Sequence, residues 1–495
     1  IGSVSKTLTT IMLMRLTDEG KLEIDKPVES YIPAFSINQR FPQSSPITIR
    51  SMLTHHSGLP TDIFMGGFTA NKADPLWLDW LTGYLKDEYT ANPVGYSFAY
   101  SNTAFVLLHK VMESASGQPF YSYTDAMFDL LGMKDTTFGS RALPPERVSK
   151  AYVLGQEQPY LYANISTAGS VRSTVKDMAR YMSTVLLAQG GSFIKPATMG
   201  EIFRDQTTGN AADDTWKHGL CFFLSDPALD YAGRIAWHNG ATVDQTAHME
   251  IMLDQGLGVV VLTNSITGIG MAGEAAKKAL QLALEAKKGI KPSEPAPCPD
   301  SNSATPPSGL VDTIIGVYVG EGSPIFISAG ESGTLKTSID GNETQLGYLE
   351  NGRWKKAGGS SQIEFRKVGD DTIMFVWDNA TNSLRAGKLF RPAEITPAWL
   401  ARLGDWEIIN LPADDEANFV IKEVALVSKT ASFRVEKGAL VMDGALRKNM
   451  TLYPQSDTLA FTAGVGRNRG ESVRILMEDG HEVVLMSGAK YKKKA

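Results

Sequence analysis

Cysteine is scarce in this chain, which has only Cys221 and Cys298 among its 495 residues. Two thiols are too few for a disulfide framework or a thiolate metal cluster. Histidine, aspartate and glutamate also lack metal-ligand spacings such as His-Glu-x-x-His. We therefore expect neither a metal ion nor a cofactor.

Long apolar runs and an excess of basic residues are missing as well. The longest apolar runs, such as residues 258–262, have the length of a strand, so we expect no transmembrane segment. The net charge of −6 argues against a nucleic-acid partner, because such proteins usually carry a dominant basic face. The basic run 492–494 is interpreted as a solvated tail. Oligomeric state and localisation stay open.

The chain has the composition of a globular protein, and its length predicts two to four domains. Residues 1–288 mix helical and strand patterns. Apolar spacing predicts helices over 3–18, 103–116, 176–188 and 272–288, and strands over 248–253 and 258–263.

Residues 289–309 are predicted to be a linker, because six prolines fall between residues 291 and 309 among many polar residues. Beyond it, short alternating segments are separated by turn residues, a pattern typical of antiparallel β structure. Two small barrels, over 310–396 and 397–495, are one interpretation of this region. A single barrel over 310–495 is the alternative.

Three short motifs, far apart in the sequence, contain the residue types that acyl transfer requires. They are Ser3-Val4-Ser5-Lys6, Tyr100-Ser101-Asn102 and His238-Asn239-Gly240. None is specific by itself, because similar matches occur at 173–176, 162–164 and 56–58. Their interpretation therefore depends on their order and surroundings.

Ser3 and Lys6 lie three residues apart at the start of a predicted helix, so their side chains share one face. A serine hydroxyl needs a neighbouring base to become a nucleophile. Lysine is such a base only when desolvation or a nearby cation lowers its pKa towards neutrality. The alternative is that Ser3 caps the helix and Lys6 is solvated.

Tyr100 is a candidate proton shuttle between the serine and a leaving group. Asn102 is a candidate for binding both Lys6 and a substrate amide. The alternative is a core tyrosine followed by an asparagine helix cap.

The third motif is expected on an edge strand beside a cleft. Gly240 would allow a substrate backbone to approach, and the N–H groups of Ala241 and Ser3 would together form an oxyanion hole. His238 is expected to titrate near physiological pH, bonded to Tyr100 or a substrate carboxylate. A purely structural histidine is the alternative.

The context of these motifs resembles the serine β-lactamase-like superfamily. This superfamily contains class C β-lactamases, D-alanyl-D-alanine carboxypeptidases, D-aminopeptidases and β-lactamase-like esterases. The matching stretches, in the order seen in that superfamily, are 2–9, 47–60, 100–103, 131–133, 167–174 and 256–264. The resemblance covers residues 1 to about 285.

The resemblance implies an α+β fold, with an antiparallel sheet flanked by helices and a helical subdomain, followed by a lipocalin-like β-barrel region. It implies the acylated nucleophile at Ser3, its base at Lys6, the shuttle at Tyr100 and a substrate ligand at Asn102. His238 and Gly240 fall on the third motif.

Two features depart from the resemblance. Class C β-lactamases have Lys-Thr-Gly at the third motif, and histidine there resembles D-aminopeptidases and some carboxypeptidases. The superfamily fold also normally has a helix and at least two strands before the nucleophile helix, whereas this sequence begins at Ile1. We expect a preceding segment to be missing from it, which would leave a sheet edge unpaired.

The leading functional hypothesis is a serine peptidase or amidase acting on small or D-residue-containing peptides. The alternatives are a carboxylesterase, a β-lactamase, and a catalytically silent protein that binds a peptide or cell wall. Residues 464–470, with two guanidinium groups, are the best candidate for a barrel loop that enters the active-site cleft. A plain hairpin loop is the alternative.

Overall fold

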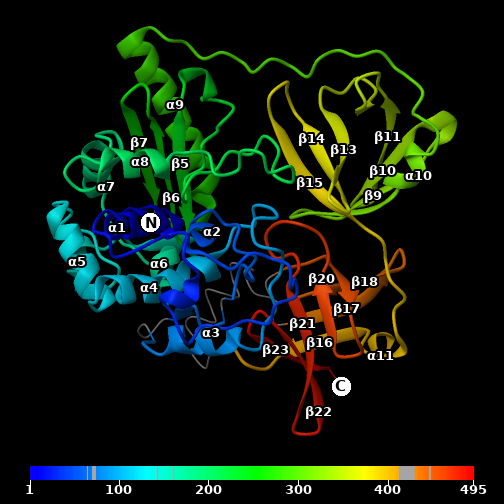
Figure 1. The fold of residues 1–495 in the computed structure, drawn as a ribbon, viewed down its shortest axis with the longest axis horizontal. Coiled ribbons are helices and arrows are strands. Elements are labelled where there is room, and N and C mark those ends of the chain that lie inside the picture. Colours follow the sequence, from blue (N-terminus) through cyan, green and yellow to red (C-terminus); the bar gives the residue numbers. More distant parts are fainter. Residues whose placement is uncertain are drawn as a thin grey trace.

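The structure is a computed structural model that describes residues 1–63, 65–69, 74–141, 143–159, 161–411, 430–444 and 447–494. Helices and a sheet form one body from the N-terminal part of the chain, and two β-barrels lie against it, as Figure 1 shows. This arrangement agrees with the expected α+β fold followed by barrels.

The motif Ser3-Val4-Ser5-Lys6 lies where a 3-10 turn passes into an α-helix. Gly2–Val4 form a 3-10 turn, and the α-helix α1 (Ser5–Asp18) continues from it. Every residue from Ser5 to Met14 is buried, because α1 runs through the middle of the domain against α4 (Asn102–Ser116) and α6 (Ser166–Gly169). A helix buried on all sides positions its first turn rigidly.

A three-stranded antiparallel sheet lies beside this first turn. Strands β5 (Ile235–Ala241), β6 (Thr246–Met252) and β7 (Leu257–Thr263) pair in chain order, and α9 (Ile269–Lys288) packs on β6 and β7. β5 is an edge strand, as predicted. Among the described residues, β7 pairs with β6 alone.

The remaining elements of this domain surround α1 and α4. The helices are α2 (Ile49–Leu53), α3 (Trp77–Leu85), α5 (Phe120–Leu130), α7 (Val175–Tyr181) and α8 (Pro196–Ile202). The short strands are β1 (Phe68–Thr69), β2 (Ala151–Val153), β3 (Gln156–Gln158) and β4 (Tyr162–Ala163). The helix predicted over 176–188 is wrong in its second half, where a π-helical turn (Met182–Leu186) replaces the α-helix.

After α9, the described structure has no helix or strand until α10 (Leu310–Ile314). Two closed antiparallel barrels follow, so the alternative of a single barrel over 310–495 is wrong. The first contains β8 (Gly316–Val319), β9 (Ile325–Ala329), β10 (Leu335–Ile339), β11 (Asn342–Tyr348), β12 (Trp354–Lys356), β13 (Gln362–Val368), β14 (Asp371–Trp377) and β15 (Ser383–Phe390). The second follows α11 (Pro397–Leu400) and contains β16 (Gly404–Ile408), β17 (Thr430–Glu436), β18 (Ala439–Asp443), β19 (Met450–Pro454), β20 (Leu459–Thr462), β21 (Ser472–Glu478), β22 (His481–Met486) and β23 (Ala489–Lys493).

Each barrel has its own hydrophobic core, and both are joined to the first domain by buried ion pairs. Arg385 on β15 of the first barrel donates to Asp213 at 2.9 Å. Arg474 on β21 of the second barrel donates to Glu88 at 2.7 Å. The two barrels therefore dock on the first domain through specific charged contacts.

Candidate active site

Ser3 and Lys6 are in direct contact at the start of α1. The Lys6 ammonium donates a hydrogen bond to Ser3 Oγ at 3.0 Å, and also to Asn102 Oδ1 and the Ala168 carbonyl, each at 2.6 Å. The Lys6 side chain is fully buried. The alternative of a solvated Lys6 is therefore wrong.

Burial lowers the pKa of Lys6 to about 7, because the desolvated ammonium loses the stabilisation that water provides. The charge of Arg467 also lowers this pKa, whereas Cys221 and Asp62 raise it. A lysine with a pKa near 7 exists partly as the free amine at neutral pH, and the free amine can accept a proton from Ser3.

Tyr100 lies on the cavity side of Lys6. The Lys6 ammonium is 4.9 Å from the centre of the Tyr100 ring, and the Arg467 guanidinium is 5.1 Å from it. Burial raises the pKa of Tyr100, and the nearby Ser3 hydroxyl opposes that rise. Within the described residues the buried Tyr100 hydroxyl has no hydrogen-bond partner of good geometry.

Asn102 is the first residue of α4, but Ser101 is the residue that caps this helix, through its side chain and the N–H of Ala104. The side chain of Asn102 therefore points away from the helix end. Its carbonyl oxygen accepts from Lys6, and its amide nitrogen donates to Asp62 at 2.7 Å. The alternative of an asparagine cap is wrong.

Strand β5 runs directly beside the Ser3 turn. A Cβ on Gly240 would lie 2.1 Å from the carbonyl oxygen of Ile1 and 2.9 Å from the amide nitrogen of Ser3. A Cβ on Gly2, whose φ is +53°, would lie 2.5 Å from the nitrogen of Ala241. The absence of a side chain at Gly240 therefore allows the Ser3 turn to pack directly against β5, and Gly240 also lines the cavity.

His238 is placed differently from expectation. Its side chain is fully buried, Nδ1 lies 2.5 Å from the carbonyl oxygen of Asn239, and its ring centre is 6.0 Å from that of Tyr100. Desolvation, reinforced by the charge of Lys6, lowers the pKa of His238 to about 3. His238 is therefore neutral at physiological pH, and the expectation that it titrates there is wrong.

A cavity of about 600 Å³ opens above these residues. Ser3, Tyr100 and Asn102 line it together with Asn239, Gly240 and Ala241 of β5. The remaining wall in the first domain is largely apolar and is formed by Met65, Phe68, Phe98, Ile165, Trp216, Phe223, Val243, Ile266 and Ile269. Such a cavity suits a small molecule that carries both a polar reacting group and apolar substituents.

The second barrel supplies part of the cavity wall. Arg467 and Asn468, from the loop 464–470, line it with Arg447, Ser487 and Ala489 of the same barrel, so this loop reaches the cleft. Glu321 of the first barrel also contributes. Of the two guanidinium groups in this loop, that of Arg467 binds the carboxylate of Asp62, and that of Arg469 donates to the Gly320 carbonyl.

Two contributors to the site were missed from the sequence. The Ala168 carbonyl holds Lys6, and it lies within the motif 167–174, so the motif could have suggested it. Asp62 lies two residues beyond the motif 47–60, but an isolated acidic residue in a loop has no distinguishing pattern. Two of the chance matches to the motifs have structural roles. In 56–58, His56 bonds Asp213 at 2.8 Å, and in 173–176, Thr174 caps α7.

The described residues contain neither a candidate metal site nor a candidate membrane span. No group of three or more histidine, cysteine, aspartate or glutamate side chains there could hold a metal ion. None of the described helices combines the length and the apolar composition that a membrane-spanning segment needs.

Comparison with known proteins identifies the first domain. The family model described as Beta-lactamase matches residues 1–284. Penicillin-binding protein 4* of Bacillus subtilis (strain 168) is 27% identical over 293 residues, which are 53% of this chain and 60% of that protein. The D-alanyl-D-alanine-carboxypeptidase/endopeptidase AmpH of Escherichia coli (strain K12) is 31% identical over 193 residues, 38% of this chain and 48% of that protein. The matched part of the chain thus spans only about half the length of these relatives.

Among solved structures, the crystal structure of SurE is similar over 76% of this chain and 81% of its own, with 19% identity and a TM-score of 0.50. At this identity the likeness concerns the fold alone. It extends beyond the 284 residues that the family model matches.

Proposed function

This chain belongs to the β-lactamase family, and we propose on this basis that it is a serine hydrolase that cleaves amide bonds of small peptides through an acyl-enzyme on Ser3. The observation that carries this proposal is the contact between Lys6 and Ser3. A fully buried amine with a pKa of about 7 lies 3.0 Å from a hydroxyl that lines an open cavity. This is the arrangement that an activated serine requires.

In the acylation step, the free amine of Lys6 accepts the proton of Ser3 Oγ as the oxygen attacks the substrate carbonyl carbon. The backbone N–H groups of Ser3 and Ala241 are proposed to bind the resulting oxyanion. Tyr100 delivers a proton to the leaving nitrogen as the C–N bond breaks to release an amine, and it regains a proton from the Lys6 ammonium, which returns Lys6 to the free amine. Water then attacks the Ser3 ester while Lys6 accepts a proton from it, and the same proton passes to Ser3 Oγ as the ester C–O bond breaks and the acid is released.

Peptides are favoured over β-lactams as substrates. His238 occupies the place of the lysine in the Lys-Thr-Gly motif of class C β-lactamases, and it is buried and neutral, so it provides no cation there. The name of one relative, a D-alanyl-D-alanine carboxypeptidase/endopeptidase, supports peptides that contain D-residues. The apolar wall of the cavity supports short substrates with apolar side chains.

Covalent labelling tests the nucleophile. The full chain is incubated with a fluorophosphonate or with a penicillin, and the adduct is located by peptide mass spectrometry. We expect one adduct, on Ser3, and none in Ser3→Ala. The matched control is Ser5→Ala, since Ser5 is the neighbouring serine but donates to the Gly2 carbonyl. Labelling that persists in Ser3→Ala would contradict the proposal.

A substrate panel tests the reaction. Peptide p-nitroanilides of both stereochemistries, p-nitrophenyl esters and nitrocefin are compared at neutral pH. We expect turnover of amides and no turnover of nitrocefin. Turnover of esters without amides would make the chain an esterase and refute the amidase proposal.

A further inference from the structure

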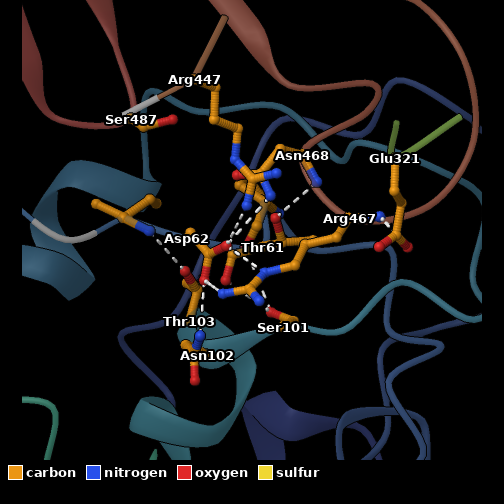
Figure 2. A network of polar contacts seen from close by, with 12 residues as sticks. Thr61, Asp62, Ser101, Asn102, Thr103, Glu321, Arg447, Arg467, Asn468 and Ser487 are labelled. Atoms are coloured by element: carbon orange, nitrogen blue, oxygen red, sulfur yellow. Dashed lines mark hydrogen bonds and ion pairs between the residues drawn. The ribbon is translucent and has the colours of Figure 1, made fainter. Parts of the chain in front are cut away.

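Asp62 is a buried acceptor at which the catalytic domain and the second barrel meet (Figure 2). Arg467 donates to it twice, from Nε at 2.6 Å and from Nη2 at 3.0 Å. Arg447 Nη2 and Asn468 Nδ2 each donate to Oδ2 at 3.2 Å. From the catalytic side, Asn102 Nδ2 donates to Oδ1. One carboxylate therefore joins three side chains of the barrel to Asn102.

The loop that carries Arg467 is held on two sides. A Cβ on Gly464, whose φ is +104°, would lie 2.5 Å from the carbonyl oxygen of Val319 in the first barrel. A Cβ on Gly470, whose φ is +78°, would lie 2.0 Å from the carbonyl oxygen of Ala91 in the catalytic domain. The loop thus lies between the catalytic domain and the first barrel, and only glycine fits at positions 464 and 470, where the loop contacts them.

Asp62 determines which end of the Asn102 amide faces Lys6. An ionised carboxylate only accepts hydrogen bonds, so it must face the amide nitrogen. The amide oxygen is then turned to Lys6, where it accepts at 2.6 Å. Burial raises the pKa of Asp62, but the charges of Arg467 and Arg447 and the hydrogen bond from Arg467 outweigh it and lower this pKa overall. Arg467 therefore keeps Asp62 ionised.

We propose that the second barrel completes the active site, with Arg467 as a positioning residue that acts on Lys6 directly through its charge and also holds Asp62 and Asn102 in place beside it. The inference rests on the proposed function, because it assumes that Lys6 is the base for Ser3. It adds that the protonation state of Lys6 depends on the second barrel as well as on the catalytic domain.

The sign of the effect follows from the charges around Lys6. Removing the cation of Arg467 raises the pKa of Lys6, and removing the anion of Asp62 lowers it. Among the residues that the structure describes, six titratable or charged groups face Lys6 from the elements packed around it: Asp62, Arg467, Cys221, Tyr100, His55 and His238. Both changes leave the last four groups in place.

The test compares full-length Arg467→Gln and Asp62→Asn in the pH dependence of kcat/KM on the p-nitroanilide that the wild type cleaves. We expect the acidic limb to move to higher pH in Arg467→Gln and to lower pH in Asp62→Asn. At the optimum we expect kcat to fall by roughly twofold to thirtyfold in both, with KM less affected. A folded fraction that is constant with pH scales the rate without moving the midpoint of a limb, so the midpoint together with circular dichroism over the same pH range separates this role from loss of stability.

Arg474→Gln is the matched control, because it removes another buried ion pair between the same barrel and the same domain, away from the cavity. It should leave the limb in place. Arg467→Lys keeps the cation, so its acidic limb should stay near the wild-type position while kcat falls. If Arg467→Gln does not fold, Arg467→Lys and Asp62→Asn are compared instead.

Limbs that move in the same direction, or that do not move relative to Arg474→Gln, would overturn the inference. Ser3→Ala distinguishes that result from failure of the proposed function. If Ser3→Ala abolishes turnover, an unmoved limb refutes only the role of Arg467. If Ser3→Ala remains active, the acyl-enzyme proposal itself fails.

Discussion

Gly240 faces the amide nitrogen of Ser3 so closely that a Cβ on it would lie 2.9 Å away. Gly240→Ala should therefore displace the nucleophile turn. We expect a stability loss of about 1–3 kcal/mol, as in other overpacked sites, and a fall in kcat/KM of roughly 10²-fold if the Ser3 N–H is an oxyanion donor. Urea titration and steady-state kinetics measure the two effects.

The matched control for this substitution is Gly270→Ala on α9, where a Cβ would meet nothing within 4 Å. Alanine is favoured over glycine in a helix, so stability should stay unchanged or rise by at most about 1 kcal/mol. Equal losses in the two variants would contradict the steric argument.

Tyr100→Phe should impair amide cleavage more than ester cleavage. An amine leaving group needs a proton as it departs, whereas a p-nitrophenolate does not, so loss of the hydroxyl should lower kcat on p-nitroanilides by roughly 10²- to 10⁴-fold. Tyr123→Phe is the control, because Tyr123 is also buried and donates to a carbonyl of α1 but does not line the cavity. Equal losses on amides and esters would argue against proton delivery by Tyr100.

Activity should rise with pH through about 7, where Lys6 loses its proton. The protonated amine cannot accept the proton of Ser3, so kcat/KM should fall about tenfold for each pH unit below this value. The arginine in Lys6→Arg is always charged, so this variant should be inactive at every pH. A pH-independent kcat/KM between pH 5 and 8 would exclude Lys6 as the base.

Acid should destabilise the fold through three buried histidines. Desolvation is the main cause of the low pKa values of these histidines. It lowers the pKa of His238 to about 3, and it lowers the pKa values of His55 and His218 well below the ordinary value. The unfolded chain binds these protons below about pH 6.5 and the folded chain does not, so stability is lost as pH falls from there. Each histidine contributes up to roughly 1.4 kcal/mol per pH unit.

Urea titrations between pH 5 and 7 measure this slope. His218 lies among Phe98 and Phe223, with ring centres 4.9 and 5.1 Å away, so a phenylalanine is compatible with its surroundings. His218→Phe should reduce the slope by up to roughly 1.4 kcal/mol per pH unit. An unchanged slope would show that His218 does not contribute to it.

The secondary structure near the site was largely predictable because local patterns determine it. Apolar spacing predicted α1, α4 and α9 to within a few residues, and the strands predicted over 248–253 and 258–263 correspond to β6 and β7. The π-helical turn after Tyr181 was not predictable, because apolar spacing does not distinguish it from an α-helix.

In the candidate site, too, some features were predictable from the sequence and others were not. Ser3, Lys6, Tyr100 and Asn102 were recognisable from motifs whose order matched a known family, and the structure brings them around one cavity. The charge state of His238 was not recognisable, because it depends on complete burial beside Lys6.

The sequence by itself therefore determined the residue types for acyl transfer, the family and the presence of a β-rich region after a proline-rich linker. Only the tertiary structure decided that Lys6 is desolvated, that Asp62 anchors Asn102, and that Arg467 reaches the cavity from a barrel position 405 residues beyond Asp62 in the chain. The physical reason is that motifs and periodicity encode local geometry. Desolvation and charge coupling depend on groups that only folding brings together.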